Sequence, residues 1–158
     1  MFRTPVVLVA MFASYASLGL SQGDVPIGLF PYSVGNKCGY INQQGDIIVP
    51  SQFHLCREFS EGMAGISIAD KHGYIDASGK TVIPVKFDGF FPESFSEGFA
   101  PVKVKSADGE IKVGFLSRSG NITLFPNASE VGSFYEGLAK VKRNGKWGYI
   151  DQNMKFVI

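Results

Sequence analysis

One six-residue motif recurs through this chain and constrains its fold more than any other feature. The motif reads Lys-Trp-Gly-Tyr-Ile-Asp at Lys146–Asp151, and it has imperfect copies at Lys37–Asn42, Lys71–Asp76 and Lys112–Ser117. Aligned on their glycines, the copies follow one another at steps of 34, 41 and 34 residues. Self-similarity at such a period indicates an array of similar structural units that stack on their neighbours.

Each of the first three motifs is followed by the same three features in the same order, whereas the fourth has Met154 in place of the turn glycine and stops before its proline. A turn glycine comes first, then an apolar run that ends at a proline, then a Phe-x-Glu-Gly segment that leads into alternating apolar and polar residues. In the second repeat these are Gly79, Val82–Pro84, Phe95–Gly98 and Ala100–Val104. Glycine permits a tight turn, proline suits the end of a strand, and alternation is typical of a strand with one buried face. Each repeat is therefore predicted to form three short strands.

A single three-stranded unit cannot bury its apolar face alone, whereas stacked neighbours bury it together. We therefore expect an all-β fold, an array of short three-stranded antiparallel meander repeats in a curved, solenoid-like or propeller-like stack. The aromatic residues of the Phe-x-Glu-Gly segments are expected to anchor its core, and Asn144-Gly145 is expected to form a hairpin. Residues 22–35 are predicted to be an N-terminal cap or degenerate repeat. The repeats are expected at about residues 36–70, 71–111 and 112–144, with a partial copy at 145–158.

The combined pattern resembles the WG repeat, also called the KWG repeat, over residues 36–158. The motif, the Gly-Lys-x-Val-Ile-Pro run and the Phe-x-Glu-Gly-Leu-Ala-x-Val segment carry this resemblance. The motif tryptophan survives only at Trp147, and Cys38, His72 and Val113 replace it elsewhere. The resemblance implies all-β repeat modules of surface, secreted and multidomain proteins, with no shared enzymatic activity. It therefore implies a fold more than a function.

The first 21 residues have the pattern of a secretory signal peptide. Arg3 supplies a positive charge, Val6–Ala13 is an apolar core, and Gly19 and Ser21 place small residues at a cleavage site. The alternative is an uncleaved anchor, but the apolar run is short of the roughly 20 residues that span a membrane. We expect cleavage after Ser21, no stable membrane span afterwards, and a secreted or periplasmic, extracytoplasmic location.

The charges are balanced, with 15 basic and 14 acidic residues in the whole chain. A neutral protein has no overall attraction to nucleic acid, so we expect no nucleic-acid partner. Basic residues nevertheless gather in the third strands, where they are expected to point outward as a basic stripe of Lys103, Lys105, Lys140, Lys142 and Arg143. The stripe either binds an acidic glycan, an anionic surface or a protein, or it is an ordinary solvated strand face.

Few residues suggest catalytic or metal chemistry. Glu61, Glu97 and Glu136 recur at equivalent positions, which favours a structural hydrogen bond to turn backbone over catalysis. Asp76 and Asp151 are likewise expected to accept from turn amides. Cys38 and Cys56 either pair as a disulfide or remain thiols, and with His54 and His72 they match no zinc-ligand spacing. We expect no cofactor and no metal.

The sequence favours a secreted or envelope-associated, non-enzymatic repeat protein that mediates macromolecular interaction or has a structural role. Its partner would be a protein or a glycan. The alternative is a carbohydrate-recognition module that uses exposed aromatics such as Tyr40, Tyr74 and Tyr149 with the basic stripe. A hydrolase regulator or an unrecognised enzyme is a third interpretation, which lacks a unique acid–base constellation. Phe156–Ile158 is predicted to be an apolar edge strand. We therefore expect that the chain either self-associates through the C-terminal partial repeat or is a truncated form of a longer array.

Overall fold

The computed structural model describes residues 28–88, 93–106 and 108–158. The predicted signal peptide and the first part of the predicted cap lie outside these residues. The described residues form strands, turns and bends and contain no helix, and none of them therefore forms a helix long and apolar enough to cross a membrane. The strands are β1 (Phe30–Val34), β2 (Lys37–Ile41), β3 (Ile47–Phe53), β4 (Leu55–Cys56), β5 (Met63–Ile68), β6 (Lys71–Asp76), β7 (Thr81–Asp88), β8 (Phe99–Lys105), β9 (Ile111–Ser117), β10 (Ile122–Leu124), β11 (Ala128–Tyr135), β12 (Leu138–Arg143) and β13 (Lys146–Asp151).

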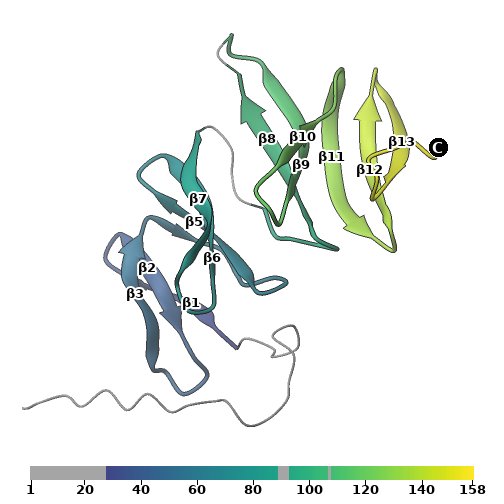
Figure 1. The fold of residues 1–158 in the computed structure, drawn as a ribbon. Helices are drawn as coiled ribbons and strands as arrows, with labels where there is room; N and C mark the ends of the chain where they lie inside the picture. Colours follow the sequence, from purple (N-terminus) through teal and green to yellow (C-terminus); the bar gives the residue numbers. More distant parts are fainter. Residues whose placement is uncertain (1–27, 89–92, 107) are drawn as a thin grey trace, which may run out of the picture.

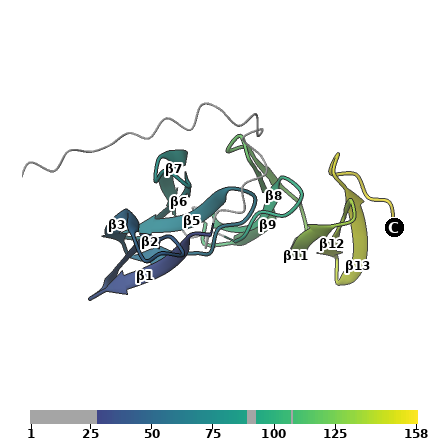
Figure 2. The same ribbon diagram turned by 90° about the horizontal axis from the view of Figure 1, so that it is seen from below.

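The strands form four small antiparallel sheets, which confirms the all-β prediction. We number them by their order along the chain: sheet I is β1-β2-β3, sheet II is β4-β5-β6-β7, sheet III is β10-β9-β8, and sheet IV is β11-β12-β13. Figure 1 shows sheet I at one end of the molecule and sheet IV at the other, with the C-terminal residue beside β13, and Figure 2 shows the same order from below. The molecule is an open array of sheets rather than a closed ring.

Each sheet combines parts of two successive sequence repeats. The third strand of one repeat pairs with the motif strand of the next, so the predicted hairpin at Asn144-Gly145 joins β12 to β13. Strand β1 pairs with β2 in the same register, since Phe30 lies opposite Ile41 as Ala139 lies opposite Ile150. Strand β1 therefore holds, relative to β2, the position that the third strand of a repeat holds relative to the next motif strand.

The second strand of a repeat runs from one sheet into the next, which the sequence did not predict. Strand β3 pairs with β2 in sheet I, and after one residue the chain continues as β4, which pairs with β5 in sheet II. In the same way, β10 belongs to sheet III and the following β11 belongs to sheet IV. Consecutive sheets are thus held together by the chain itself.

The motif glycine is required by a close approach of two backbones. In sheets I and II the register between the motif strand and the second strand shifts at this glycine. A Cβ placed on Gly73 would lie 2.6 Å from the carbonyl oxygen of Ile83, and one on Gly114 or Gly148 would lie still closer to the partner backbone. A real Cβ would have to push the second strand out of the sheet, so only glycine fits this position.

Both faces of an inner sheet are buried, each in a different core. In sheet II, Tyr74 and Ile83 pack toward sheet III with Phe95, whereas Ile66 and Ile75 pack toward sheet I. A third core lies between sheets III and IV and contains the buried residues Phe115, Phe134, Ala139, Val141 and Ile150. The cores therefore lie between the sheets, one at each interface.

The aromatic anchors contact the motif aromatics of the preceding sheet, as predicted for a shared core. Phe95 stacks edge-on against Tyr74 with ring centroids 5.0 Å apart, and Phe134 lies at the same distance from Phe115. Both phenylalanines are almost completely buried. The first anchor, Phe59, is only half-buried, with its ring 4.9 Å from that of Tyr40.

The C-terminal residues do not form the terminal strand that the sequence predicts. Phe156 makes a single β-bridge with Ile150, and Tyr149 donates its N–H to the carbonyl oxygen of Ile158. Strand β13 nevertheless ends at Asp151, and no further strand follows it within the described residues. Phe156 packs against Phe125 of the preceding sheet, which fixes this segment beside β13.

Candidate interaction surface

Successive sheets are joined by hydrogen bonds from one Phe-x-Glu-Gly segment to the next. The Glu61 carboxylate accepts from the N–H of Gly98 at 2.9 Å, and the Glu97 carboxylate accepts from the N–H of Gly137 at 2.8 Å. The structural role predicted for these glutamates is confirmed, but the turn that each one binds belongs to the next sheet. The residue spacing could not show this, because the acceptor and donor lie 37 and 40 residues apart.

Each of these glutamates also binds a side chain from the turn that follows the motif strand of the next sheet. The guanidinium of Arg118 lies 3.4 Å from the Glu61 carboxylate and donates to the Glu61 carbonyl oxygen. The amide of Gln152 donates to the Glu97 carboxylate at 2.9 Å. We call this arrangement the glutamate clasp: a carboxylate of one sheet held by a glycine N–H and a turn side chain of the next.

A serine hydroxyl accompanies each clasp. Ser60 Oγ donates to the carbonyl oxygen of Phe95 at 2.6 Å, and Ser96 Oγ donates to that of Phe134 at 2.7 Å. Both bonds cross from one sheet to the next, so they add polar contacts beside the apolar core. In the third segment Tyr135 replaces this serine and is 75% exposed.

The clasp is incomplete at the C-terminal end of the array. Glu136 occupies the position of Glu61 and Glu97, and it shares their positive φ angle, at 49°. Its side chain is exposed, and within the described part of the chain its carboxylate accepts no hydrogen bond. A preorganised acceptor therefore faces solvent at this end.

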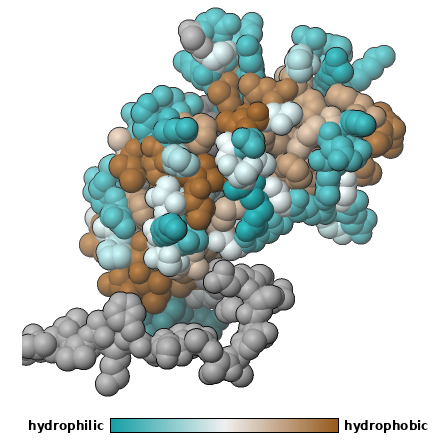
Figure 3. Space-filling view, viewed as in Figure 1, coloured by the Kyte–Doolittle hydropathy of each residue, from teal (hydrophilic) through white to brown (hydrophobic). Residues whose placement is uncertain are grey.

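The outward face of sheet IV corresponds to faces whose motif aromatics, Tyr40, Tyr74 and Phe115, are buried in the other sheets. Alternation along β12 and β13 places it opposite the core residues Ala139, Val141 and Ile150. We define this terminal face as Tyr135, Leu138, Lys140, Lys142, Trp147, Tyr149 and Ile158. Figure 3 shows hydrophobic residues reaching the surface at the right-hand edge, where Figure 1 places the C-terminal residues.

Comparison with equivalent positions shows how much apolar surface this face exposes. Trp147 is 54% exposed, whereas Cys38 at the same motif position is 7% exposed. Ile158 is 78% exposed. At the same position, ten residues after a motif glycine, Val49 and Ile83 are buried and Leu124 is 38% exposed. No sheet formed by the described residues lies on this face. A contiguous exposed apolar patch of this kind is characteristic of an interaction site.

The basic stripe is divided between two sheets. Lys103 and Lys105 are exposed on β8 in sheet III, whereas Lys140, Lys142 and Arg143 lie on β12 in sheet IV. Lys142 pairs with Glu130 at 2.8 Å and lies over the ring of Trp147, and Arg143 lies over the ring of Phe156. Two of the five cations are therefore engaged within sheet IV itself.

Two of the three tyrosines proposed for carbohydrate stacking are buried, which contradicts that part of the prediction. Tyr40 and Tyr74 are at most 1% exposed, and their hydroxyls donate to the carbonyl oxygens of Arg57 and Glu93. Burial raises the pKa of both phenols well above the usual range. Only Tyr149 is partly accessible. The sequence indicated alternating strands but not that both faces of each inner sheet are covered.

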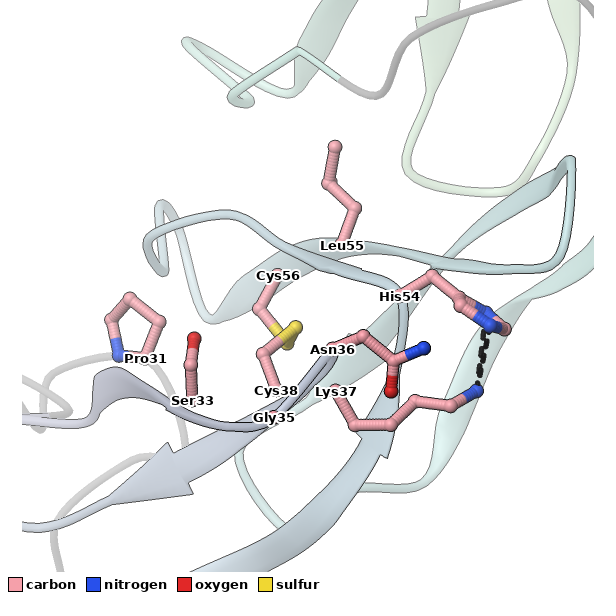
Figure 4. A pocket seen from close by; sticks show the side chains of 9 residues that line it. All are labelled: Pro31, Ser33, Gly35, Asn36, Lys37, Cys38, His54, Leu55 and Cys56. Atoms are coloured by element: carbon pink, nitrogen blue, oxygen red, sulfur yellow. Dashed lines mark hydrogen bonds between the residues drawn. A yellow bond between two sulfur atoms is a disulfide. The ribbon is translucent and has the colours of Figure 1, made fainter.

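Cys38 and Cys56 form a disulfide that joins sheet I to sheet II. The bond borders a hollow of about 460 Å³, whose lining residues are shown in Figure 4. His54 lies in this hollow, where its Nδ1 accepts from the N–H of Ala69, and Lys37 Nζ lies 2.8 Å from its Nε2. The disulfide leaves no thiolate for a metal, and the described residues contain no cluster of three metal-ligating side chains.

The aspartates that end the motif hold the following turn, as predicted. Asp76 accepts from the N–H groups of Ser78 and Lys80, and Asp151 accepts from those of Asn153 and Lys155. Burial alone would raise the pKa of Asp76, but these hydrogen bonds and one from the Ser78 hydroxyl outweigh it, so the pKa is lowered. The backbone hydrogen bond from Lys155 likewise lowers the pKa of Asp151. These carboxylates are parts of the fold.

Comparison with known proteins supports the repeat assignment. No curated protein and no solved structure matches the chain. A family model described as the WG containing repeat matches residues 39–71, 73–106, 114–147 and 147–158. These segments coincide with the three complete repeats and the partial fourth repeat whose motif strands are β2, β6, β9 and β13. The chain therefore belongs to the WG-repeat family.

Proposed function

We propose that this WG-repeat chain is an extracytoplasmic, non-enzymatic protein that binds another macromolecule through the terminal face of sheet IV, in an interaction or structural role. The observation that carries the proposal is the exposure of Trp147 and Ile158, whose equivalents in sheet I are buried. Exposed aromatic residues beside aliphatic ones are characteristic of the centres of protein interfaces. The remaining sheets would act as a rigid support for this face.

Two features support export. The N-terminal residues have the pattern of a secretory signal peptide. The Cys38–Cys56 disulfide is of a kind that persists in oxidising compartments and is rare in the cytosol. N-terminal sequencing of the protein from an extracytoplasmic fraction should give a chain that begins near Gln22. Recovery of the protein only in the cytoplasm, with Met1 or Phe2 at its N-terminus, would contradict the proposal.

The binding role can be tested with a photoreactive phenylalanine analogue at Tyr135, which is exposed on the terminal face. The matched control carries the analogue at Lys80, an exposed turn residue of sheet II. Irradiation in the native extracytoplasmic fraction should give a discrete adduct from position 135 that is absent from position 80. The adduct should disappear when Trp147 is also changed to glutamate. No adduct at position 135, or identical adducts at both positions, would contradict a specific binding face.

A carbohydrate ligand is the second candidate, and the exposure of Trp147 and Tyr135 favours it. Flat aromatic rings beside cations can stack on sugars and bind acidic groups. A glycan array probed with the chain and with its Trp147→Ala variant tests this function. Binding of a defined glycan by the chain but not by the variant supports it. A signal that is equal for both proteins, or absent for both, counts against it.

A further inference from the structure

The first sheet of the array carries the half of the glutamate clasp that sheet IV lacks. The register of β1 on β2 matches that of β12 on β13, so Gly28 falls two residues before Phe30 as Gly137 falls two residues before Ala139. Gly28 thus occupies the position of Gly98 and Gly137, whose N–H groups donate to the clasp glutamates. Sheet I presents a glycine at the clasp position, and none of the described residues forms a sheet before it.

The second donor of the clasp is also present in sheet I. Gln43 lies four residues after its motif glycine, as Gln152 does after Gly148. Its side chain lies beside Gly28, because a Cβ built on Gly28 would be 2.8 Å from Gln43 Nε2. Gly137 and Gln152 together bind the Glu97 carboxylate. Sheet I therefore holds the same pair of donor types, a glycine N–H and a glutamine amide.

Sheet I exposes apolar side chains, as the terminal face does. Phe30 is 51% exposed and Ile47 is 61% exposed, and both lie on the side of sheet I that faces away from sheet II. The equivalent of Ile47 in sheet IV is Phe156, since each lies opposite the motif isoleucine. Phe156 packs against Phe125 of the preceding sheet, which shows what this position contacts when a sheet is in place.

We propose that a second copy of this chain docks head to tail on the first, so that the interface between inner sheets continues from sheet IV of one copy to sheet I of the next. The Glu136 carboxylate accepts from the N–H of Gly28 and from the Gln43 amide of the second copy, and the terminal face covers Phe30 and Ile47. This inference rests on the proposed binding role of the terminal face and names the partner. The contact joins two different surfaces, so each bound copy still has one free surface and can bind a further copy. Repeated contacts give linear assemblies unless the chain of copies closes into a ring.

The hydrogen-bonding groups of the clasp favour a second copy over an acidic polysaccharide at this face. The free carboxylate of Glu136 repels an acidic ligand and needs hydrogen-bond donors, which Gly28 and Gln43 supply without a competing negative charge. The Lys142 ammonium is already paired with Glu130 and lies over Trp147. A charge-assisted hydrogen bond in a partly buried interface is stronger than one between neutral groups. The clasp therefore gives the apolar contact a defined orientation.

The test uses the purified, disulfide-intact chain in a dilution series from about 1 µM to 1 mM, followed by sedimentation velocity and by fluorescence. Trp147 is the only tryptophan, so its emission reports directly on the terminal face. Head-to-tail docking predicts that the average mass rises with concentration and that the emission shifts to shorter wavelength over the same range. A chain that remains monomeric throughout, with constant emission, would overturn the proposal.

Two variants that place opposite charges at the two ends of the chain test whether copies dock head to tail. Glu136→Lys and Gln43→Glu should each weaken self-association about tenfold or more, because one removes the acceptor and the other places two carboxylates together. An equimolar mixture of the two variants should recover association, since each mismatched end then meets its complement. The matched controls Glu110→Lys and Gln44→Glu change exposed residues outside the clasp and should associate like the original chain. Circular dichroism at low concentration checks that every variant is folded.

Two outcomes would overturn the head-to-tail arrangement. Unchanged self-association of the Gln43→Glu variant would mean that sheet I takes no part and that the chain pairs tail to tail. Folded variants that fail to recover association when mixed would exclude the Glu136–Gln43 contact. The photocrosslinking at position 135 separates this failure from failure of the proposed function. Adducts of twice the chain mass support docking of a second copy, whereas adducts of another mass from a monomeric chain support a different partner.

Discussion

The inner interfaces and the two ends of the array are built from the same kinds of residue, but only the inner interfaces are covered. Between sheets II and III, Tyr74 and Ile83 are buried under Phe95, and Glu61 is held by Gly98 and Arg118. At sheet IV the corresponding tyrosine is partly exposed, Ile158 is exposed and Glu136 is exposed. The difference shows that a WG unit completes its interface with residues from the following unit. The terminal unit therefore retains binding surface that its neighbours have used.

The segment that leads into sheet I differs in sequence from the later segments because it lacks the clasp glutamate. The residue before Gly28 is Ile27, where the other segments have Glu61, Glu97 or Glu136. The Cys38–Cys56 disulfide joins sheet I to sheet II instead. A covalent bond thus takes the place of a hydrogen-bonded clasp at the end of the array that begins with β1.

The largest expected difference between an inner interface and the terminal face concerns their aromatic residues. Phe95→Ala removes a ring that is 2% exposed and packs on Tyr74, and it should lower the free energy of unfolding by about 3–5 kcal/mol. Trp147→Ala should lower it by less than about 1 kcal/mol, because the ring is half exposed. Urea unfolding of both variants, with Lys103→Ala as a surface control, measures the difference. Equal losses would show that the terminal face is as well packed as the inner cores.

Loss of the disulfide should have the next largest effect. The bond closes a loop between residues separated by 18 positions, and its removal by Cys38→Ser with Cys56→Ser should cost about 3 kcal/mol. Sheet I should then detach before sheets III and IV, which hydrogen exchange resolved by strand can detect. If the loss were uniform over all four sheets, the disulfide would not be specific to the first interface.

The clasp itself should contribute less than the aromatic core. Glu97→Ala should cost about 1–2 kcal/mol, because the carboxylate accepts from Gly137 and Gln152 in a partly exposed setting. Glu136→Ala in dilute solution should change stability by about 0.5 kcal/mol or less, since its carboxylate accepts no hydrogen bond within the described residues. Thermal unfolding of the two variants under identical conditions makes the comparison. A larger effect at Glu136 than at Glu97 would contradict the clasp.

The smallest expected effect is a pH dependence from the turn aspartates, which inner and terminal units share. The folded state lowers the pKa of Asp76, so its stabilising contribution is complete above the unfolded pKa of about 4 and is lost as the pH falls through the folded value. Asp76→Asn should therefore reduce the loss of stability below about pH 4. Melting temperatures of the chain and this variant between neutral pH and pH 3 test the sign. A larger acid loss in the variant would contradict it.

The local features of this fold can be predicted from sequence because short-range patterns determine them. The turn glycines, the Asn144-Gly145 hairpin and the turn-capping role of Asp76 all depend on residues within a few positions. Other features depend on how one sheet lies on the next. These are the burial of Tyr40 and Tyr74 and the hydrogen-bond partners of Glu61 and Glu97. Alternation in a strand shows that it has two faces, but not that both are covered. Contacts between residues about forty positions apart can be identified only from the three-dimensional arrangement of the sheets.

The glutamate clasp is tested most directly by amide hydrogen exchange at its glycines, measured by nuclear magnetic resonance in dilute solution. The Gly98 and Gly137 N–H groups donate to Glu61 and Glu97, so they should exchange slowly. The Gly28 N–H, for which the described residues provide no clasp carboxylate, should exchange fast and should become protected only as the concentration rises. Two results would contradict the proposal that each sheet is hydrogen-bonded to the next through the clasp. One is fast exchange at all three glycines, and the other is protection of Gly28 equal to that of Gly137 in the monomer.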